Sequence, residues 1–307
     1  TLCLANSERI KLPETLHMMF EVQDLKVASP ATVSRCGMVY MEQVHVGMLS
    51  LVRSWGLKVL ERLLPEKTSQ IIELIEGVIE DAVKFVRTKC KEKVPSNNHN
   101  LVQSFLNLLE SLLDPEKGMN PQHPEIDKLI KLYFVWALVW SVGGNVDDKS
   151  RPLFQDFVKD KCSSLVTGTD QAFFGDVYGF VVDPADAKFT PWTRHMDSFT
   201  FDREMPYFNI LVPTVDTTRY TYLLNKLMKS GFNVLYMGET GVGKSVIMQS
   251  FLDSMSRTSE YVSFSMSYSA QTKPVNLKDV METKLEKKRK NLFGPPAGKK
   301  MMFFIDD

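Results

Sequence analysis

The fold of this chain is decided by Gly238-Glu239-Thr240-Gly241-Val242-Gly243-Lys244-Ser245, a complete G-x-x-x-x-G-K-S phosphate loop. The run Asn233–Met237 before it is rich in β-forming residues, and Val246–Leu252 after it has helical spacing of apolar residues. Strand, glycine loop and helix in this order are the context that the motif requires. Glycines let successive backbone N–H groups approach a phosphate, and the helix adds its positive N-terminal end. The sequence therefore predicts a nucleoside triphosphate site.

All eight residues of this loop are candidate ATP-binding residues. Lys244 is expected to reach the β- and γ-phosphates, and the Ser245 hydroxyl is expected to bind Mg²⁺. Asp306 is a second candidate Mg²⁺ ligand, because it directly follows the apolar run Met301–Ile305. The adjacent Asp307 is the candidate base that would polarise the attacking water. This pairing predicts ATP or ADP with Mg²⁺ as cofactors, and a solvent-facing turn of two acids is the alternative.

Composition excludes several other classes of function. The chain has 307 residues, which favours about two domains, and its 37 basic and 37 acidic residues give zero net charge. Such a balance gives no general attraction to nucleic acid or to an acidic membrane. The histidines are scattered without ligand spacing, so no zinc or other structural metal is expected. The cysteines lie far apart and are expected to be reduced thiols of an intracellular protein: Cys3, Cys36, Cys90 and Cys162.

Hydropathy shows no signal peptide and no membrane span. The most apolar run, Leu132–Val142, is too short to cross a bilayer and predicts a buried helix instead. The chain opens inside a strand-like run and stops directly after another. We therefore expect it to be a segment of a much longer soluble polypeptide.

The first half of the chain changes character once. Residues 1–45 predict short strands and turns, with a hairpin around Asn6-Ser7-Glu8 and a further strand at Leu16–Val22. Residues 46–163 predict an all-helical unit whose apolar stripes form a core. Prolines punctuate its expected helices, which are Val46–Leu64, Thr68–Cys90, Asn100–Leu113, Pro124–Val142 and Pro152–Cys162.

The second half returns to mixed structure. Residues 164–210 predict an aromatic-rich connector with a strand within Val177–Val182, and their lack of basic charge disfavours a base-stacking surface. Residues 211–307 alternate helices with strands, which implies a parallel sheet. The expected helices are Tyr220–Lys229, Lys244–Asp253 and Pro274–Lys290, the last with a solvated charged face. The expected strands are Val234–Met237, Tyr261–Tyr268 and Lys300–Ile305, and Phe293–Gly298 is an expected loop.

The chain resembles the motor region of a dynein heavy chain, and the axonemal branch in particular. The likeness extends over nearly all of the chain. It is carried by Phe20–Leu25, Ala31–Val39, the phosphate loop, and Phe293-Gly294-Pro295-Pro296-Ala297-Gly298-Lys299-Lys300 followed by Phe304-Ile305-Asp306-Asp307. The resemblance implies a motor-ring fragment that runs from the end of the second AAA+ module through the Walker B element of the third.

This resemblance also implies the domain organisation. Residues 1–45 would be the C-terminal part of the second large subdomain, and 46–163 its small helical subdomain. Residues 164–210 would connect the modules, and 211–307 would begin the third large subdomain. The fold class is accordingly α/β: an AAA+ P-loop large subdomain, with a parallel sheet and helices, plus a preceding all-α small subdomain.

Further site residues follow from the resemblance alone. Arg35 lies where an arginine finger would reach the first module's ATP in trans, and a guanidinium suits γ-phosphate charge; pairing with a surface carboxylate is the alternative. Glu21 occupies the place of a polar sensor in the second module, which fits a structural nucleotide site there. Backbone groups of Val212, Pro213 and Thr214 would flank the adenine.

The resemblance also raises a question about hydrolysis. Related AAA+ ATPases commonly carry Asp-Glu where this chain has Asp306-Asp307. The shorter side chain sets its carboxylate back by about one C–C bond, and a displacement of that order costs on the order of a hundredfold in rate. The sequence thus predicts secure nucleotide binding with slow turnover at this site.

As a whole, the implied function is part of an ATP-hydrolysing microtubule motor of the axoneme, in the cytoskeleton of a cilium or flagellum. The third module would act as a regulatory nucleotide switch. Implied partners are neighbouring AAA+ modules of the same heavy chain, dynein intermediate and light chains, and microtubules contacted through other parts of the chain, which also hold its coiled coil. No nucleic acid or membrane partner is implied. The alternatives are a structural ring module that holds nucleotide permanently, and an unrelated P-loop NTPase.

Overall fold

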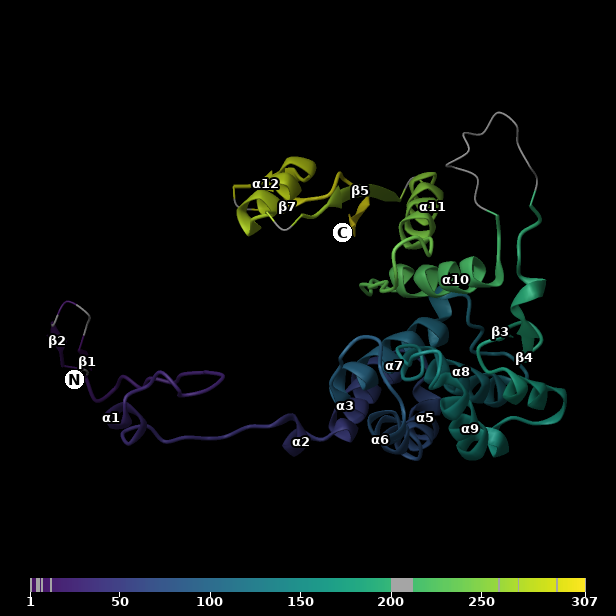
Figure 1. Cartoon of the computed structure of the whole chain (residues 1–307), viewed down its shortest axis with the longest axis horizontal. Coiled ribbons are helices and arrows are strands. Elements are labelled where there is room, and N and C mark those ends of the chain that lie inside the picture. Colours follow the sequence, from purple (N-terminus) through teal and green to yellow (C-terminus); the bar gives the residue numbers. More distant parts are fainter. Residues whose placement is uncertain are drawn as a thin grey trace. The chain divides into compact units, whose positions relative to one another are not determined.

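The computed structural model describes residues 2–3, 6, 8–11, 13–199, 212–258, 260–269, 271–290 and 292–306. The chain divides into two units, Thr1–His45 and Val46–Asp307, which are described separately below (Figure 1). Within the described part of the chain, no helix is long and apolar enough to cross a membrane.

The first unit contains little regular structure. Strands β1 (Leu2–Cys3) and β2 (Arg9–Ile10) pair antiparallel, which confirms the hairpin predicted near the start of the chain. Two short helices follow, α1 (Pro30–Val33) and α2 (Gln43–Val46), the first capped by the Ser29 hydroxyl. The strand predicted for Leu16–Val22 is wrong, because these residues pair with no strand in the part of the chain that the structure describes.

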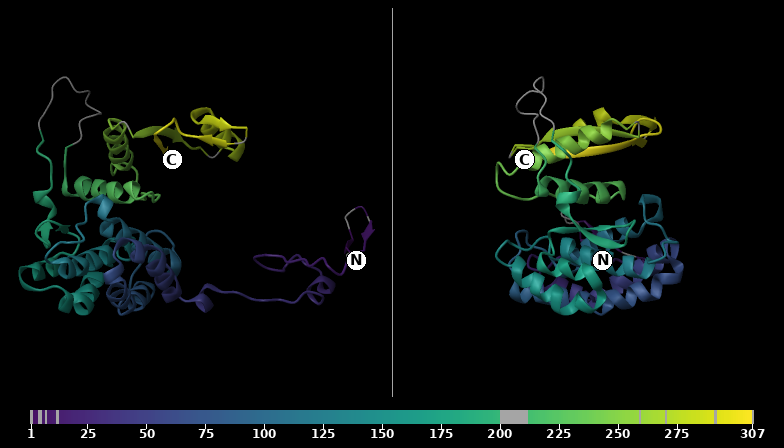
Figure 2. Two further views of the ribbon diagram at one scale, coloured as in Figure 1. Left: turned by 180° about the vertical axis from the view of Figure 1, so that it is seen from behind. Right: turned by 90° about the vertical axis from the view of Figure 1, so that its right-hand side faces the viewer.

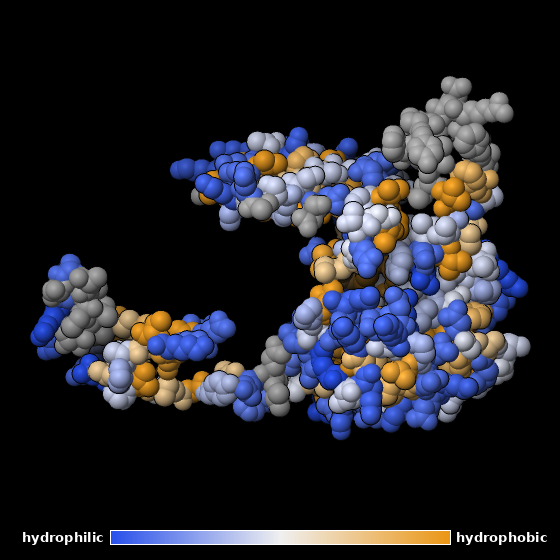
Figure 3. Space-filling view, viewed as in Figure 1, coloured by the Kyte–Doolittle hydropathy of each residue, from blue (hydrophilic) through white to orange (hydrophobic). Residues whose placement is uncertain are grey.

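The first unit also exposes many large apolar side chains, as Figure 3 shows. They include Met19, Phe20, Val27, Val39 and Tyr40. Most of this segment therefore buries no core of its own.

The helical region begins with a long interrupted helix. Helix α3 (Met48–Trp55) continues as the π-helical turn η1 (Gly56–Leu60) and as α4 (Glu61–Leu63). The turn η2 (Pro65–Lys67) precedes α5 (Thr68–Glu76) and α6 (Ile79–Lys89). The single helix predicted for Thr68–Cys90 is therefore wrong in one respect, since it breaks at Gly77–Val78. Glycine is a poor helix former, so a break is least costly at such a position.

Three further helices complete this region. Helix α7 (Asn98–Leu113) begins with a capping box in which Asn97 and Asn100 exchange side-chain hydrogen bonds, and the turn η3 (Pro115–Lys117) follows it. Helices α8 (Ile126–Ser141) and α9 (Arg151–Cys162) come next. Every residue of Leu132–Val142 is buried, so the prediction of a buried helix is confirmed.

The segment after α9 packs into the same core. Turns η4 (Ser163–Leu165) and η5 (Gly168–Gly175) lead to an antiparallel hairpin of β3 (Phe180–Asp183) and β4 (Lys188–Pro191), followed by η6 (Trp192–Arg194). Its aromatic residues join the helical core, and indole N–H groups of Trp136 and Trp192 donate to the carbonyls of Phe180 and Tyr178 at 2.9 and 3.1 Å. The described part of this expected connector is therefore fixed to α8 rather than loosely attached.

The last region has the expected alternation of helices and strands (Figures 1 and 2). Helices α10 (Val215–Lys229) and α11 (Lys244–Ser256) precede β5 (Tyr261–Ser267), α12 (Pro274–Lys284) and β8 (Lys300–Asp306). Strands β5 and β8 pair in parallel from Tyr261↔Lys300 to Ser267↔Asp306, which confirms the α/β class. A small core of Leu224, Phe251, Leu252, Met255 and Met302 lies between these helices and the sheet.

Two sequence predictions in this region are wrong. The helix predicted to reach Lys290 ends at Lys284, and β6 (Glu286–Arg289) replaces its last part; β6 pairs with β7 (Leu292–Gly294), which overlaps the start of the expected loop. A run of basic residues repels itself at helical spacing, whereas a strand points alternate side chains to opposite faces. The strand predicted for Val234–Met237 has no ladder partner among the described residues.

Candidate phosphate-binding site

The phosphate loop lies between the segment 233–237 and the first residue of α11. Gly243 is the N-cap of that helix and has φ +87°, and Gly241 has φ +86°. Nothing lies within 4 Å of a Cβ built at either glycine, so the backbone conformation rather than space requires glycine there. Two left-handed residues in three turn the chain sharply, and this lets the loop enter α11 with its amide groups near the positive end of the helix.

Lys244 closes this loop. Its Nζ donates to the carbonyl oxygens of Gly238 at 2.9 Å and Glu239 at 2.8 Å. The loop residues Gly238–Val242 are exposed, so the ammonium group and the loop backbone are accessible to a ligand. An ammonium with three donors is a compact positive charge that suits a phosphate.

Ser245 and Asp306 are brought together from opposite ends of this region. The Ser245 hydroxyl at the start of α11 donates to Asp306 Oδ1 at the end of β8, at 3.0 Å. Parallel pairing of β5 and β8 fixes this end of the sheet, where the Tyr268 amide donates to the Asp306 carbonyl at 2.9 Å. A hydroxyl and a carboxylate are hard oxygen donors of the kind that Mg²⁺ prefers, so these two residues fit the expected metal.

The structure places the remaining predicted residues with less detail. Asp307 lies outside the described residues. Thr214 is the N-cap of α10 and forms a capping box with Thr217, and the side chain of Val212 is about half exposed. Within the described residues, no hydrogen bond joins 212–214 to the phosphate loop.

Arg35 and Glu21 belong to the first unit and are both exposed. Arg35 lies two residues after the end of α1, and its amide donates to the carbonyl of Thr32 at 3.2 Å. No carboxylate among the described residues forms an ion pair with its guanidinium. The alternative of a surface ion pair for Arg35 therefore gains no support from the described contacts.

Sequence reasoning did not identify the role of α10, which contacts both cores of the second unit. On one side, the rings of Tyr220 and Tyr222 pack against the tryptophan cluster of the helical region, with Tyr222 5.8 Å from Trp136 and Tyr220 6.3 Å from Trp140. On the other side, its Leu224 is buried in the small core beneath the phosphate loop. Figure 2 shows α10 between the helical region and α11.

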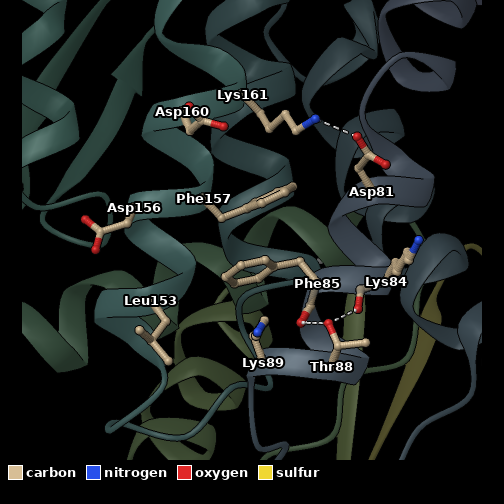
Figure 4. Close-up of a pocket in the computed structure, with 10 residues that line it drawn as sticks. All are labelled: Asp81, Lys84, Phe85, Thr88, Lys89, Leu153, Asp156, Phe157, Asp160 and Lys161. Carbon is tan, nitrogen blue, oxygen red and sulfur yellow. Dashed lines mark hydrogen bonds and ion pairs between the residues drawn. The ribbon is translucent and has the colours of Figure 1, made fainter.

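A groove in the described part of the chain lies away from this loop, between α6 and α9 (Figure 4). It has a volume of about 550 Å³ and is crossed by an ion pair of 2.6 Å between Lys161 and Asp81. Phe85 and Phe157 stack on its floor with ring centres 4.7 Å apart. Helix side chains line it, without a glycine loop or a helix N-terminus, so it lacks the features of a phosphate site.

Two further kinds of site, a metal cluster and a reactive Cys162 thiol, can be tested against the described residues. Among the described residues, no three His, Cys, Asp or Glu side chains gather as metal ligands. Burial raises the pKa of the Cys162 thiol to about 12, so this side chain remains protonated and inert.

Comparison with known proteins identifies two family models in the chain. Residues 71–194 match the dynein heavy chain AAA lid domain, and residues 199–307 match the P-loop containing dynein motor region. Similar proteins include dynein axonemal heavy chains 6 and 2 of Homo sapiens, 36% identical over 312 residues and 35% identical over 311. The dynein-1-beta heavy chain of the flagellar inner arm I1 complex of Chlamydomonas reinhardtii is 30% identical over 342 residues. Each of these alignments covers 100% of this chain and 7% of the relative.

Proposed function

Because the chain belongs to the dynein heavy chain family, we propose that it is a segment of an ATP-driven axonemal motor and binds Mg·ATP or Mg·ADP at its phosphate loop. One observation carries this proposal: the Ser245 hydroxyl and the Asp306 carboxylate meet at 3.0 Å, beside the loop that Lys244 closes. A chance glycine turn would have no reason to place these three groups together.

Each group has a distinct task in this proposal. The amides of the loop and the N-terminus of α11 bind phosphate oxygens, and Lys244 exchanges its two carbonyl contacts for the β- and γ-phosphates. Ser245 and Asp306 hold Mg²⁺, directly or through water. The metal supplies charge neutralisation on the phosphates when it is bound.

The proposed module assignment is the one that the family resemblance implies. Residues 1–45 and 46–163 complete the second AAA+ module, 164–210 connect it, and 211–307 begin the third. In this arrangement the nucleotide at the third module is a regulatory switch, and hydrolysis there is slow because Asp307 is one carbon shorter than glutamate. The chain works in the axoneme of a cilium or flagellum, with intermediate and light chains, and microtubule contact comes from other parts of the heavy chain.

The nucleotide site is tested by Lys244→Ala in the full-length heavy chain. Hydrogen exchange of peptides covering 238–252 is measured as Mg·ADP is added, because this readout reports one site even where other modules bind nucleotide. We expect protection in the unmodified chain and its loss in Lys244→Ala. The exposed Lys229→Ala serves as a matched control that keeps the protection. If Lys244→Ala is protected at the same concentrations, the loop is not the binding site.

The same variant separates a regulatory switch from a structural ring module. If nucleotide is a switch, Lys244→Ala changes microtubule gliding velocity while the motor stays folded. If nucleotide is a permanent structural component, the variant lowers the melting temperature of the motor, because a ligand that binds only the folded state stabilises it. A lower melting temperature with normal velocity would reject the regulatory role.

Arg35 is proposed to donate its guanidinium to the nucleotide of the first module. Its exposed position just beyond the C-cap Ser34 of α1 leaves it available for a neighbouring site. We expect Arg35→Ala to lower the ATPase rate of the full motor, with Arg9→Ala as a control in the same unit. An unchanged rate in Arg35→Ala would remove this assignment.

A further inference from the structure

Tyr236 lies two residues before the phosphate loop and makes a directional contact to α10. Its hydroxyl donates to the backbone carbonyl of Tyr220 at 2.6 Å, and the two rings lie 6.1 Å apart in an edge-to-face arrangement. A carbonyl oxygen has two lone pairs, so Tyr220 can accept this bond and its helical bond together. Burial raises the pKa of Tyr236, and its hydroxyl therefore remains a donor at physiological pH.

This contact is the only hydrogen bond that the stem, residues 233–237, makes to the rest of the described chain. The stem has no strand partner there. Val234 and Tyr236 face the small core, while Leu235 and Met237 are exposed. Apolar packing holds one face of the stem without direction, so the hydroxyl of Tyr236 is what fixes its position along α10.

The acceptor of this bond is itself firmly held. The Tyr220 ring packs 6.3 Å from the Trp140 ring, and the Arg219 guanidinium lies over both rings at 5.2 and 5.6 Å. Arg219 is also paired with Asp216 one turn earlier on α10. The anchor point of the stem therefore belongs to the large core of the helical region rather than to the small core beneath the loop.

We propose that Tyr236 is a positioning residue for nucleotide binding, whose hydroxyl sets the phosphate loop on α10. This inference rests on the proposed function of the loop. Tyr236 touches no phosphate; it acts through Gly238, which it precedes by two residues and whose carbonyl accepts from Lys244. The loop is thus held at its start by Tyr236 and at its end by the first turn of α11.

The size of the effect follows from the population of the binding-competent loop. When a competent state is only partly populated, the apparent affinity falls by that fraction. The net free energy that a hydrogen bond between neutral groups contributes is small. Its loss is therefore expected to weaken the apparent nucleotide affinity by roughly 3- to 10-fold. Tyr236→Phe removes the hydroxyl alone and keeps the ring in the core.

The test measures hydrogen exchange of peptides covering 238–252 in the full-length heavy chain as Mg·ADP is added. In Tyr236→Phe, we expect the concentration for half-maximal protection to rise 3- to 10-fold. Tyr261→Phe is the matched control, because Tyr261 packs on the same small core and its hydroxyl bonds to no described residue. Exchange of α10 and α11 without nucleotide is measured in parallel, and a positioning role leaves it unchanged.

The outcomes are distinguishable. Equal half-protection concentrations for Tyr236→Phe and the unmodified chain would overturn this inference alone. Faster exchange throughout α10 and α11 without nucleotide would also overturn it, because Tyr236 would then have a purely structural role. Absence of protection in the unmodified chain would overturn the proposed function, and the inference with it.

Discussion

Leu224 offers a direct test of the two-core arrangement around α10. Its side chain is 1% exposed and belongs to the small core with Phe251, Leu252 and Met302. Leu224→Ala removes three carbon atoms from this core, Cγ and its two methyl groups, and leaves a cavity that only partly collapses. Substitutions of this kind cost about 2–5 kcal/mol. A cost of about 3 kcal/mol corresponds to roughly a hundredfold rise in the opening constant.

The assay is native-state hydrogen exchange, which reports the opening free energy of each element separately. Amides of α11 and β8 are expected to exchange roughly a hundredfold faster in Leu224→Ala, in line with the cost derived above. Amides of α7 and α8 are expected to keep their rates, because their core does not include Leu224. Leu223→Ala is the matched control: the neighbouring side chain packs on the large core instead.

Two results would refute this reasoning. Equal acceleration of α8 and α11 in Leu224→Ala would mean that the second unit opens as one body, with no separate small core. A change of less than about threefold in α11 would mean that Leu224 contributes little to its packing. The Leu223→Ala variant guards against a general loss of helicity in α10, which would accelerate exchange in both variants alike.

Two further predictions concern the helical region. Gly143→Ala should lower the free energy of unfolding by about 1–3 kcal/mol in urea titration, because a Cβ there would collide with the Phe154 ring; Gly175→Ala, with open space around its Cβ, should change it by less than about 0.5 kcal/mol. Asp81→Asn should reduce the loss of unfolding free energy that occurs as the pH is lowered into the acid range. The hydrogen bond from Lys161 holds the pKa of Asp81 below its ordinary 3.8, so this stabilisation is present above that value and is lost as pH falls through the lower folded pKa. An unchanged loss of unfolding free energy at low pH would contradict it.

The phosphate loop could be predicted from the sequence because its chemistry is local. Two glycines at fixed spacing, followed by Lys244 and Ser245, determine both the turn and the start of α11. The meeting of Ser245 with Asp306 is not local, yet it was also predicted. Both residues were assigned to one Mg²⁺, and that assignment requires them to lie close together.

The helical region was predictable for a different reason. Apolar residues at helical spacing are a signal that can be seen within one segment of sequence. The helices α7, α8 and α9 therefore lie within a few residues of their expected bounds. The hairpin of β6 and β7 was missed because the residues of β6 are all charged and exposed and β7 has only three residues, so neither strand carries a hydrophobic period. The sequence pattern therefore does not indicate that residues 286–289 pair with residues 292–294.

The stem of the phosphate loop shows the limit of local reasoning most clearly. Residues 234–237 have the composition of a strand, and their exposure alternates as a strand's would. Among the described residues, they are held by the packing of Val234 and Tyr236 against the small core and by the hydrogen bond from the Tyr236 hydroxyl to α10. The backbone hydrogen bonds of a strand go to a neighbouring strand, whereas those of a helix lie within it, so the composition of 234–237 alone does not show whether the segment pairs.

The position of α10 connects these observations to function. A nucleotide that orders the phosphate loop also orders its stem, and the stem is bonded to the same turn of α10 that carries Tyr220. Tyr220 and Tyr222 lie against Trp140, Trp136 and Trp192 of the helical region. Any change in the loop that shifts α10 must then repack these aromatic rings, which close-packed interiors resist. Under the proposed function, the energy of nucleotide binding would therefore be directed into the boundary between these two cores.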